Sequence, residues 1–345
     1  MTARPTGVLL LQLGTPDSTS TRDVRRYLRE FLSDPRVLDM PAVARRALLE
    51  LVILPFRPRR SAHAYRQIWT DRGSPLLALS NDLVDALSQR LGPAYRVALG
   101  MRYRNPPVAA AVTDLLDAGC ERLVLIPLFP QYSSAATGSA VQRALDEIGQ
   151  RVNVPGIAVA PAFYDHPGFV EAQAALAAPM IEEHRPDHVL FSYHGLPEKQ
   201  IRTSDTTGSW CLASATCSSE MTTQNRFCYR AQCHVTTRVI AERLGLQPGS
   251  FSTAFQSRLA GQKWIEPYTD RVIVDFAERG IRRLAVLTPS FTTDCLETLE
   301  EIGIRLRNQW ADLGGESLAL VPCVNTHPLW VDGLAGMVES VGMRA

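Results

Sequence analysis

Short apolar runs alternate with longer amphipathic stretches along the chain. The first run, Val8 to Leu13, is followed by Gly14-Thr15-Pro16, and the run Val189 to Phe191 ends in a polar cluster and a second Gly-x-Pro. Apolar runs of this length, closed by glycine and proline, are typical of strands buried in a parallel sheet. Between them, apolar residues recur at helical spacing. Helices are predicted at residues 21–33, 42–54, 81–91, 107–118, 167–184, 232–244, 269–279, 294–313 and 328–341.

The strand-like runs resemble one another in pairs, which indicates an internal repeat. Residues 8–16 match residues 189–197 in pattern, position for position. Two further pairs join residues 123–129 with 284–291 and, more loosely, residues 95–102 with 250–258. Short apolar runs are ambiguous, so the alternative that all such strands look alike stays open.

We therefore predict an α/β fold of two similar Rossmann-like halves, each a parallel sheet flanked by helices. The N-terminal half spans residues 1–165 and the C-terminal half residues 166–345, with a ligand cleft between them. The C-terminal half contains a cysteine-rich insertion at residues 205–235 and a closing helix. Because no low-complexity linker separates the halves, we expect them to be packed together.

The polar cluster after the second run is the first candidate for chemistry. His194 stands at the carboxyl end of its predicted strand, the end at which open α/β sheets bind ligands. An imidazole there can bind a metal ion or move a proton near neutral pH. The alternative is a structural histidine bonded to the backbone.

A row of carboxylates follows a neighbouring predicted strand. Asp294, Glu297 and Glu301 are spaced at i, i+3 and i+7, which puts them on one face of a helix. If the two strands share a parallel sheet, this face lies at the same edge as His194. One imidazole opposite carboxylates suits a divalent metal such as Fe²⁺, or a base with a proton exit. An acidic first turn that stabilises a helix N-terminus is the alternative.

Composition excludes several classes of protein. The 345 residues are 46% hydrophobic and 21% charged, with a net charge of +1, so nucleic acid is not an expected partner. No G-x-G-x-x-G follows a predicted strand, which argues against a dinucleotide-binding enzyme. We find no export signal and no apolar run of membrane-spanning length. We therefore expect a cytoplasmic protein in a reducing compartment.

One helical segment combines apolar and basic residues. Residues 42–54 are largely apolar with Arg45 and Arg46 among them, and the segment ends in Pro55-Phe56-Arg57-Pro58-Arg59-Arg60. Such a segment is typical of a lid or of a lip that contacts a membrane surface. An ordinary amphipathic helix stays open as the alternative. Peripheral contact with the inner membrane through residues 43–60 is therefore one expectation.

Four of the seven cysteines lie close together in the chain. Cys211, Cys217, Cys228 and Cys233 have the spacing C-x5-C-x10-C-x4-C. Four cysteines in a reducing compartment indicate a metal site, and four thiolates suit zinc or an iron–sulfur cluster alike. Free thiols without a metal stay open as a further alternative. The other three, Cys120, Cys295 and Cys323, are interpreted as buried apolar thiols.

Several motifs together resemble the ferrochelatase family. They occur in order over residues 7 to 328, and each alone is weak. They are Gly14-Thr15-Pro16, Gly73-Ser74-Pro75, Met101-Arg102-Tyr103, Phe129-Pro130-Gln131-Tyr132-Ser133, Ser192-Tyr193-His194-Gly195-Leu196-Pro197, Phe255-Gln256-Ser257-Arg258 with Trp264, and Leu296-Glu297-Thr298-Leu299. The resemblance implies a lyase that inserts Fe²⁺ into protoporphyrin IX in haem biosynthesis and releases two protons.

The resemblance also implies roles for individual residues. The catalytic residues are His194 and Glu297, which also handle the substrate Fe²⁺, and we place Asp294 and Glu301 on a proton or metal path. The porphyrin-binding residues are Leu13, Arg102, Tyr103, Tyr132, Ser133 and Trp264. Cys295 stands where relatives often have histidine, so it receives no role.

The same resemblance extends to the cysteine segment. Some bacterial ferrochelatases hold a [2Fe-2S] cluster in this region, which implies that Cys211, Cys217, Cys228 and Cys233 are its ligands. Many ferrochelatases lack these cysteines, so we expect the cluster to be structural or sensing rather than part of the insertion chemistry.

Other functions remain open at this point. They are coproporphyrin III as the substrate, a porphyrin- or haem-binding protein without turnover, and a cobalt or nickel chelatase. The carboxylate row disfavours mere binding, which needs no path for protons. His194 and Glu297 are interchangeable as proton acceptor and metal ligand on the sequence alone.

Overall fold

The structure is a computed structural model that describes residues 4–214, 216–259 and 261–343. These residues form two compact units. Unit 1 contains residues 4–128, 133–161 and 331–343, and unit 2 contains the described part of residues 129–132 and 162–330. The chain passes from unit 1 into the main part of unit 2 after residue 161, close to the predicted boundary after residue 165.

The closing helix differs from the prediction. Helix α13 (Pro328–Met343) begins in unit 2 but belongs to unit 1 from residue 331 onward. Its contacts explain the difference, because Asp332 pairs with Arg90 at 2.5 Å and the Gly342 carbonyl accepts a hydrogen bond from Arg122. Assigning this helix to the C-terminal half was therefore wrong.

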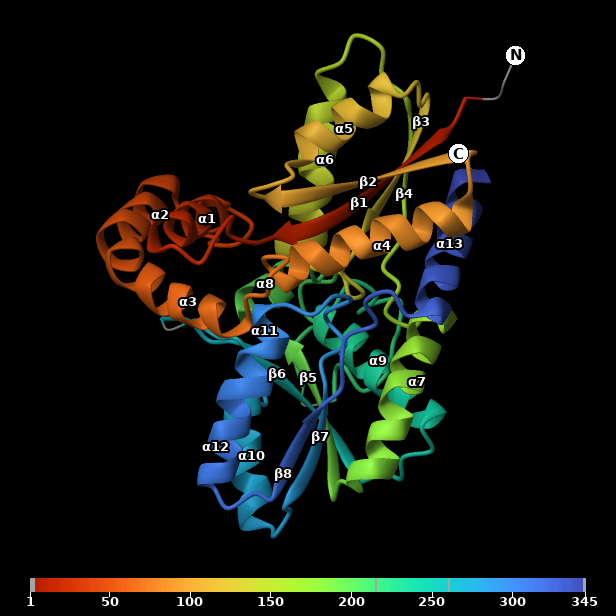
Figure 1. The fold of residues 1–345 in the computed structure, drawn as a ribbon. Helices are drawn as coiled ribbons and strands as arrows, with labels where there is room; N and C mark the ends of the chain where they lie inside the picture. Colours follow the sequence, from red (N-terminus) through yellow and green to blue (C-terminus); the bar gives the residue numbers. More distant parts are fainter. Residues whose placement is uncertain (1–3, 215, 260, 344–345) are drawn as a thin grey trace. The chain divides into compact units, whose positions relative to one another are not determined.

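Unit 1 is built on a parallel sheet with the strand order β2-β1-β3-β4 (Figure 1). The strands are β1 (Thr6–Gly14), β2 (Tyr95–Tyr103), β3 (Arg122–Pro127) and β4 (Gly156–Val159). Before α13, its helices are α1 (Thr21–Ser33), α2 (Ala42–Leu48), α3 (Leu54–Ile68), α4 (Pro75–Leu91), α5 (Val108–Asp117) and α6 (Ser139–Gly149), with π-helices η1 (Leu49–Ile53) and η2 (Ser134–Gly138).

Unit 2 repeats this plan with the strand order β6-β5-β7-β8, again all parallel. The strands are β5 (His188–His194), β6 (Phe251–Gln256), β7 (Arg283–Leu287) and β8 (Ser317–Leu320). Its helices are α7 (Pro167–His184), α8 (Glu198–Thr203), α9 (Tyr229–Arg243), α10 (Thr269–Glu278), α11 (Leu296–Leu299) and α12 (Arg307–Asp312), with π-helix η3 (Glu301–Leu306).

The strand orders confirm the predicted repeat. The three matched pairs of runs are β1 with β5, β3 with β7 and β2 with β6, and each pair occupies the same position in its sheet. The strands β4 and β8, which the sequence reading missed, form a fourth equivalent pair. A π-helix also follows the third strand of each unit, η2 after β3 and η3 after β7.

The sheet of unit 2 separates two apolar layers, because successive side chains of a strand point to opposite faces. Val189, Phe191 and Tyr193 pack with helices α7 and α9, whereas Leu190 packs with α10 and α12 on the other face (Figure 1). Burial of each large side chain contributes roughly 1.5–3 kcal/mol. The alternation puts His194 on the face of Leu190, toward η3.

Gly14 and Gly195, which the repeat aligns, both lack room for a side chain. A Cβ atom at Gly14, where φ is +118°, would lie 2.0 Å from the Tyr103 carbonyl oxygen at the end of β2. A Cβ atom at Gly195 would lie 2.8 Å from the Gln256 carbonyl oxygen at the end of β6. In both units glycine thus lets the central strand end tightly against its neighbour.

Two predicted helices differ from the structure. The segment predicted to end before Pro55 continues through η1 and α3 to Ile68, with Pro58 inside α3. The helix predicted at residues 294–313 is divided into α11, η3 and α12, and Asp294 lies outside all three.

Candidate functional site

His194 is held at the carboxyl end of β5 by three contacts. Its backbone N–H donates to the Ser290 hydroxyl at 3.0 Å, and its carbonyl accepts from the Tyr229 hydroxyl at 2.8 Å. The imidazole Nδ1 lies 2.6 Å from the carbonyl oxygen of Gly195. Because a carbonyl only accepts, Nδ1 carries the proton of the neutral ring, and Nε2 is left with its lone pair. The geometry therefore presents Nε2 as a base or a metal ligand.

Glu301 in η3 is a half-buried carboxyl group whose charge interacts with this imidazole. Ser257 donates its backbone N–H to Glu301 at 3.0 Å and also its hydroxyl. Burial raises the pKa of Glu301, against the hydrogen bonds of Ser257 and the charge of Arg305, and the neighbouring charge of Glu297 raises it further. A carboxyl group with a raised pKa can hold a proton at a pH where exposed carboxylates have lost theirs.

Glu297 lies in the short helix α11 and is partly exposed. Its negative charge acts on the carboxyl group of Glu301. Its backbone carbonyl accepts a hydrogen bond of 2.7 Å from Gln256, and Gln256 in turn accepts one of 2.7 Å from Ser192. This buried relay fixes α11 relative to β5 and β6. The structure thus brings His194, Glu297 and Glu301 into one neighbourhood, as the sequence predicted.

Asp294 does not share a helix face with these two carboxylates. It precedes α11, and its carboxylate accepts hydrogen bonds from the Asn325 amide at 2.8 Å and from Thr298 and the Cys323 backbone at 3.2 Å. The prediction of a three-residue face was therefore wrong. A carboxylate occupied in this way fixes the loop after β8, so we do not keep it on a proton path.

Two aromatic residues predicted to bind porphyrin lie in unit 2. Trp264 is buried, and its ring packs over Gly195, next to His194. Tyr132 is partly exposed, and its backbone N–H donates to Gln232 at 2.7 Å. Its ring lies 6.3 Å from that of Phe227 in the cysteine segment.

Leu13, Arg102, Tyr103 and Ser133 lie in unit 1, at the carboxyl ends of β1 and β2 or just after β3. Leu13 is partly exposed at the position equivalent to His194. Ser133 is buried and accepts the backbone N–H of Ala136, which caps η2. A contact with a macrocycle therefore stays a prediction for this group.

Asp34 is a buried residue that the sequence reading missed. Its carboxylate pairs with Arg102 at 2.7 Å and accepts hydrogen bonds from Tyr103 at 2.9 Å and from Ser139. Burial by itself raises the pKa of Asp34, but these hydrogen bonds and the charge of Arg102 outweigh it and hold the pKa below its usual value. Tyr103 is wholly buried. No local pattern marks Asp34, because its partners come from distant elements.

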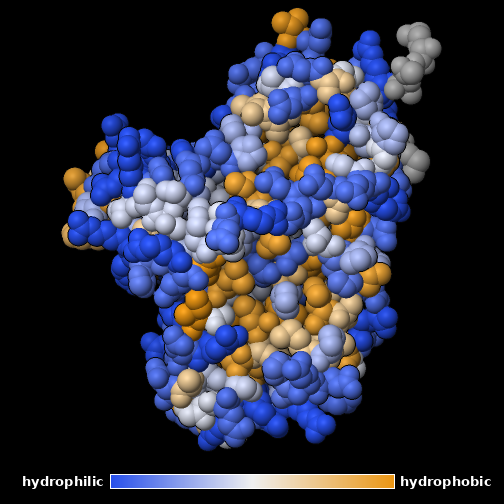
Figure 2. All heavy atoms as spheres, in the orientation of Figure 1, coloured by the Kyte–Doolittle hydropathy of each residue, from blue (hydrophilic) through white to orange (hydrophobic). Residues whose placement is uncertain are grey.

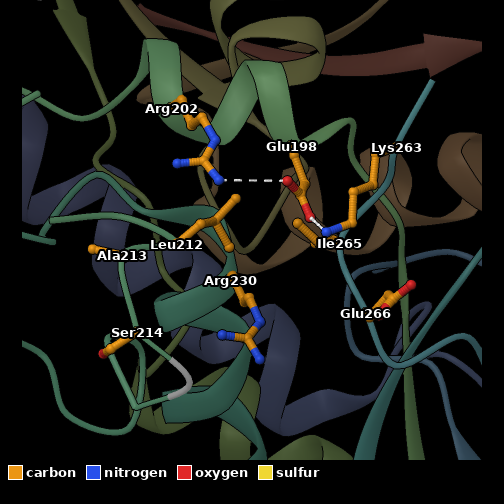
Figure 3. Close-up of a pocket in the computed structure, with 9 residues that line it drawn as sticks. All are labelled: Glu198, Arg202, Leu212, Ala213, Ser214, Arg230, Lys263, Ile265 and Glu266. Atoms are coloured by element: carbon orange, nitrogen blue, oxygen red, sulfur yellow. Dashed lines mark ion pairs between the residues drawn. The ribbon is translucent and has the colours of Figure 1, made fainter. Parts of the chain in front are cut away.

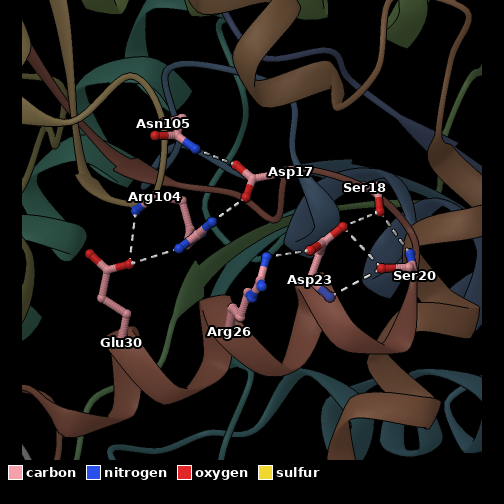
Figure 4. A network of polar contacts seen from close by, with 8 residues as sticks. All are labelled: Asp17, Ser18, Ser20, Asp23, Arg26, Glu30, Arg104 and Asn105. Carbon is pink, nitrogen blue, oxygen red and sulfur yellow. Dashed lines mark hydrogen bonds and ion pairs between the residues drawn. The ribbon is translucent and has the colours of Figure 1, made fainter.

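A second polar network fixes the loops at this edge of unit 1 (Figure 4). Arg104, with a positive φ of 71°, pairs with Asp17 and also approaches Glu30, and Asn105 donates to Asp17 at 2.8 Å. These contacts connect the loop after β1 with the loop after β2.

The four clustered cysteines are all buried in unit 2. The Leu212 backbone N–H donates to the Cys217 sulfur at 3.2 Å. Burial, together with nearby Cys228, raises the pKa of Cys211 to about 12. Within the described residues, no three His, Cys, Asp or Glu side chains gather at a point that would hold one metal ion. A [2Fe-2S] cluster shares four thiolates between two irons. Among the four cysteines, Cys211 and Cys228 interact directly.

A cavity of about 380 Å³ lies beside the cysteine segment (Figure 3). Charged side chains, including Arg202, Arg230, Lys263 and Glu198, line much of it, and none is a predicted site residue. A porphyrin needs a largely apolar slot, so this cavity does not suit it.

The helical segment α2–η1–α3 exposes large apolar side chains. Val43, Leu51, Val52 and Phe56 are 84%, 74%, 55% and 72% exposed. Figure 2 shows orange atoms at the outer end of an otherwise mostly blue region where Figure 1 draws this segment. No helix in the described part of the chain is long and apolar enough to cross a membrane.

Comparisons with known proteins agree with these observations. The sequence profile of the family Ferrochelatase matches residues 5–341. A ferrochelatase of Legionella pneumophila (strain Lens) is 47% identical over 333 residues, which cover 96% of this chain and 98% of that protein. One of Coxiella burnetii (strain CbuK_Q154) is 46% identical over 333 residues, or 96% and 93% of the two chains.

Solved structures show the same fold at low sequence identity. The structure described as SirB from Bacillus subtilis with Fe3+ has a TM-score of 0.55 and 9% identity, with 98% of this chain and 95% of that chain covered. DR2241 from Deinococcus radiodurans, described as similar to chelatases, has a TM-score of 0.51 and 12% identity over 97% of this chain and 55% of its own.

Proposed function

The chain belongs to the ferrochelatase family, and from this premise we propose that it inserts Fe²⁺ into protoporphyrin IX to form protohaem. As a metal chelatase of this family it is a lyase of haem biosynthesis. Coproporphyrin III is the alternative porphyrin. The observation that carries the proposal is the His194 imidazole, which is held through Nδ1 with Nε2 available near the partly buried carboxyl groups of Glu297 and Glu301.

These residues suit the proton chemistry of metal insertion. Two pyrrole N–H protons must leave as Fe²⁺ binds the ring nitrogens. His194 Nε2 accepts a proton, since its lone pair is not used in the ring's hydrogen bond to Gly195. Glu301 has a raised pKa and passes protons onward, and Glu297 guides the metal ion. The roles of the porphyrin-binding residues and of Arg102 toward a propionate belong to this proposal.

Anaerobic metallation of protoporphyrin IX and coproporphyrin III with Fe²⁺, followed by absorbance, tests the function. We expect turnover with the first porphyrin, and a fall in kcat of at least about a hundredfold in His194→Ala. The matched control is His166→Ala, which changes a helix-capping histidine of the same unit. Normal turnover by folded His194→Ala would refute the role of the imidazole.

We also propose that Cys211, Cys217, Cys228 and Cys233 hold a [2Fe-2S] cluster. Their burial, the N–H···S hydrogen bond from Leu212 and the proximity of Cys211 to Cys228 support it. A bound cluster would make this segment sensitive to redox conditions and would cross-link its four cysteines. Iron and sulfide analysis with visible absorption of anaerobically purified protein tests the assignment. A colourless protein without sulfide contradicts it, and zinc in its place supports the alternative.

We also propose that residues 43–60 contact a membrane surface without crossing it. Residues 21–68 contain eleven arginines against five Asp and Glu, whereas the whole chain has a net charge of +1. Basic residues attract anionic lipid by about 1 kcal/mol each, and exposed apolar side chains insert at the interface. The exposed Val43, Leu51, Val52 and Phe56 support this contact.

A further inference from the structure

The cavity beside the cysteine segment has no part in the proposed reaction, and its lining combines apolar and cationic side chains (Figure 3). Leu212 and Ile265 supply the apolar part, and Ile265 is almost wholly buried. In this view Leu212 lies between Arg202 and Arg230. The volume of about 380 Å³ is within the range of sites that bind small molecules.

The two carboxylates of the lining act mainly on its lysine. Glu198 lies 2.9 Å from the Lys263 ammonium group, and this contact, together with the charge of Glu266, raises the pKa of Lys263. Arg202 lies 3.5 Å from Glu198, which is longer than an ordinary N–H···O hydrogen bond. The charge of Lys263 is thus compensated within the protein more fully than that of Arg202.

Arg230 has no carboxylate partner in the described part of the chain. It is the second residue of α9 and half-buried, and its guanidinium donates to the Ser218 hydroxyl at 2.7 Å. A guanidinium has five N–H donors, so most of those of Arg230 are left for other acceptors. A partly buried cation without a counter-charge favours an anionic ligand.

We propose that this cavity is a binding site for a small organic dianion, in the simplest case a short linear dicarboxylate. Arg202 and Arg230 each bind one acidic group, because a guanidinium fits a carboxylate through two parallel hydrogen bonds. Leu212 and Ile265 contact the carbon chain between the two groups. None of these residues belongs to the proposed catalytic site, so the inference does not rest on the proposed function.

The segment that carries Trp264 forms one wall of this cavity. Lys263 and Ile265 line the cavity, whereas Trp264 between them packs over Gly195. Successive side chains of an extended segment point to opposite sides, which explains this division. Two backbone hydrogen bonds of 2.9 Å fix the segment against residues 196–198. A bound ligand is therefore expected to shift the indole resonance of Trp264.

Titration with simple anions tests the site. Succinate, glutarate and adipate are added to full-length protein at constant ionic strength, because salt screens such contacts. Calorimetry gives the affinity, and the Trp264 indole resonance, assigned with Trp264→Phe, gives the location. We expect saturation with a Kd below about 1 mM for at least one dicarboxylate, and binding about tenfold weaker for butyrate and inorganic phosphate.

Three results would overturn the proposal. They are no saturation by any dicarboxylate up to about 10 mM, phosphate binding as tight as that of the dicarboxylates, and binding that leaves Trp264 unshifted. The second result would mean an adventitious ion only, and the third would place the ligand elsewhere.

Variants of the lining test the assigned contacts. We expect Arg230→Gln and Arg202→Gln each to weaken dicarboxylate binding about tenfold or more, since each removes a charge-assisted contact. The matched control is Arg243→Gln, which changes an arginine of the same helix that pairs with Glu171 outside the cavity. An equal loss in Arg243→Gln would contradict the site.

Ala213→Glu provides a test that does not depend on the stability of the arginine variants. Ala213 is exposed and lines the cavity, so the substitution adds a repelling carboxylate and removes no side-chain hydrogen bond. We expect binding to weaken about tenfold or more, with thermal unfolding unchanged. Wild-type affinity in Ala213→Glu would refute the site. These measurements need no iron insertion, so they decide the inference even if the proposed function fails.

Discussion

The surroundings of Asp34, which is buried, and of Glu301, which is half-buried, shift the pKa values of the two carboxyl groups in opposite directions. Asp34 in unit 1 is surrounded by donors and a guanidinium, so its charged form is favoured despite burial. Glu301 in unit 2 has fewer compensating contacts and lies near the like charge of Glu297, so its neutral form is favoured. The first arrangement suits a structural anchor, and the second suits a group that exchanges protons.

Replacing Asp34 should destabilise the protein. Asp34→Ala leaves the half-buried Arg102 without its partner, so we expect the free energy of unfolding at pH 7 to fall by about 3 kcal/mol. The lowered pKa means that the contribution of Asp34 is present above the usual Asp pKa and is lost as pH falls through the folded-state value. Urea unfolding between pH 3 and pH 7 checks this, with Asp34→Asn expected to weaken the acid dependence. A loss as large at pH 3 as at pH 7 would contradict it.

Replacing Glu301 should have the reverse effect on stability. A carboxyl group with a raised pKa contributes stability below its unfolded pKa, and this is lost as pH rises through the folded value. We therefore expect Glu301→Gln to stabilise the fold by about 1 kcal/mol at pH 7 while kcat falls. Thermal unfolding and metallation assays measure the two effects. Glu300→Gln, a neighbour paired with Arg305, is the control and should lower stability or leave it unchanged.

At the scale of the element, the sequence predicted regular helices well and irregular ones poorly. Helices α1 and α7 begin and end where predicted, since a polar cap or a proline marks each start. Residues 294–313 were read as one helix, because a 3.6-residue pattern does not reveal a π-helical stretch. The pairing of His194 with Glu297 and Glu301 was predictable from parallel strands, whereas Asp34 and Tyr229 depend on tertiary contacts.

The exposed apolar residues of η1 and α3 give an element-scale prediction. Leu51→Ser with Phe56→Ser should abolish sedimentation with vesicles of phosphatidylcholine and phosphatidylserine, because both side chains are exposed and available for insertion. Stability should change by less than about 0.5 kcal/mol. The control is Val152→Ser, an exposed apolar residue outside the segment. Binding that is unaffected by the double substitution, or absent in the wild type, would refute a lipid-facing role.

At the scale of the whole molecule, the repeat predicts that substitutions at aligned positions of the two units destabilise the protein to a similar degree. Gly14→Ala and Gly195→Ala should each destabilise the protein by about 2 kcal/mol or more, since the new methyl group meets backbone that cannot give way. The loss should be larger at Gly14, where φ is also positive. Gly149→Ala, which meets nothing within 4 Å, is the control for thermal or urea unfolding. Well-tolerated alanines at both positions would argue against this equivalence.

The tight backbone turns at Gly14 and Gly195 also limit where the two units can differ. Each turn fixes the backbone conformation, so the residue before the glycine lies at the end of a central strand, whatever its side chain. One copy fills that place with the aliphatic Leu13 and the other with the imidazole of His194. A duplicated scaffold can in this way acquire a reactive group on one side only, by a single exchange that leaves both sheets intact.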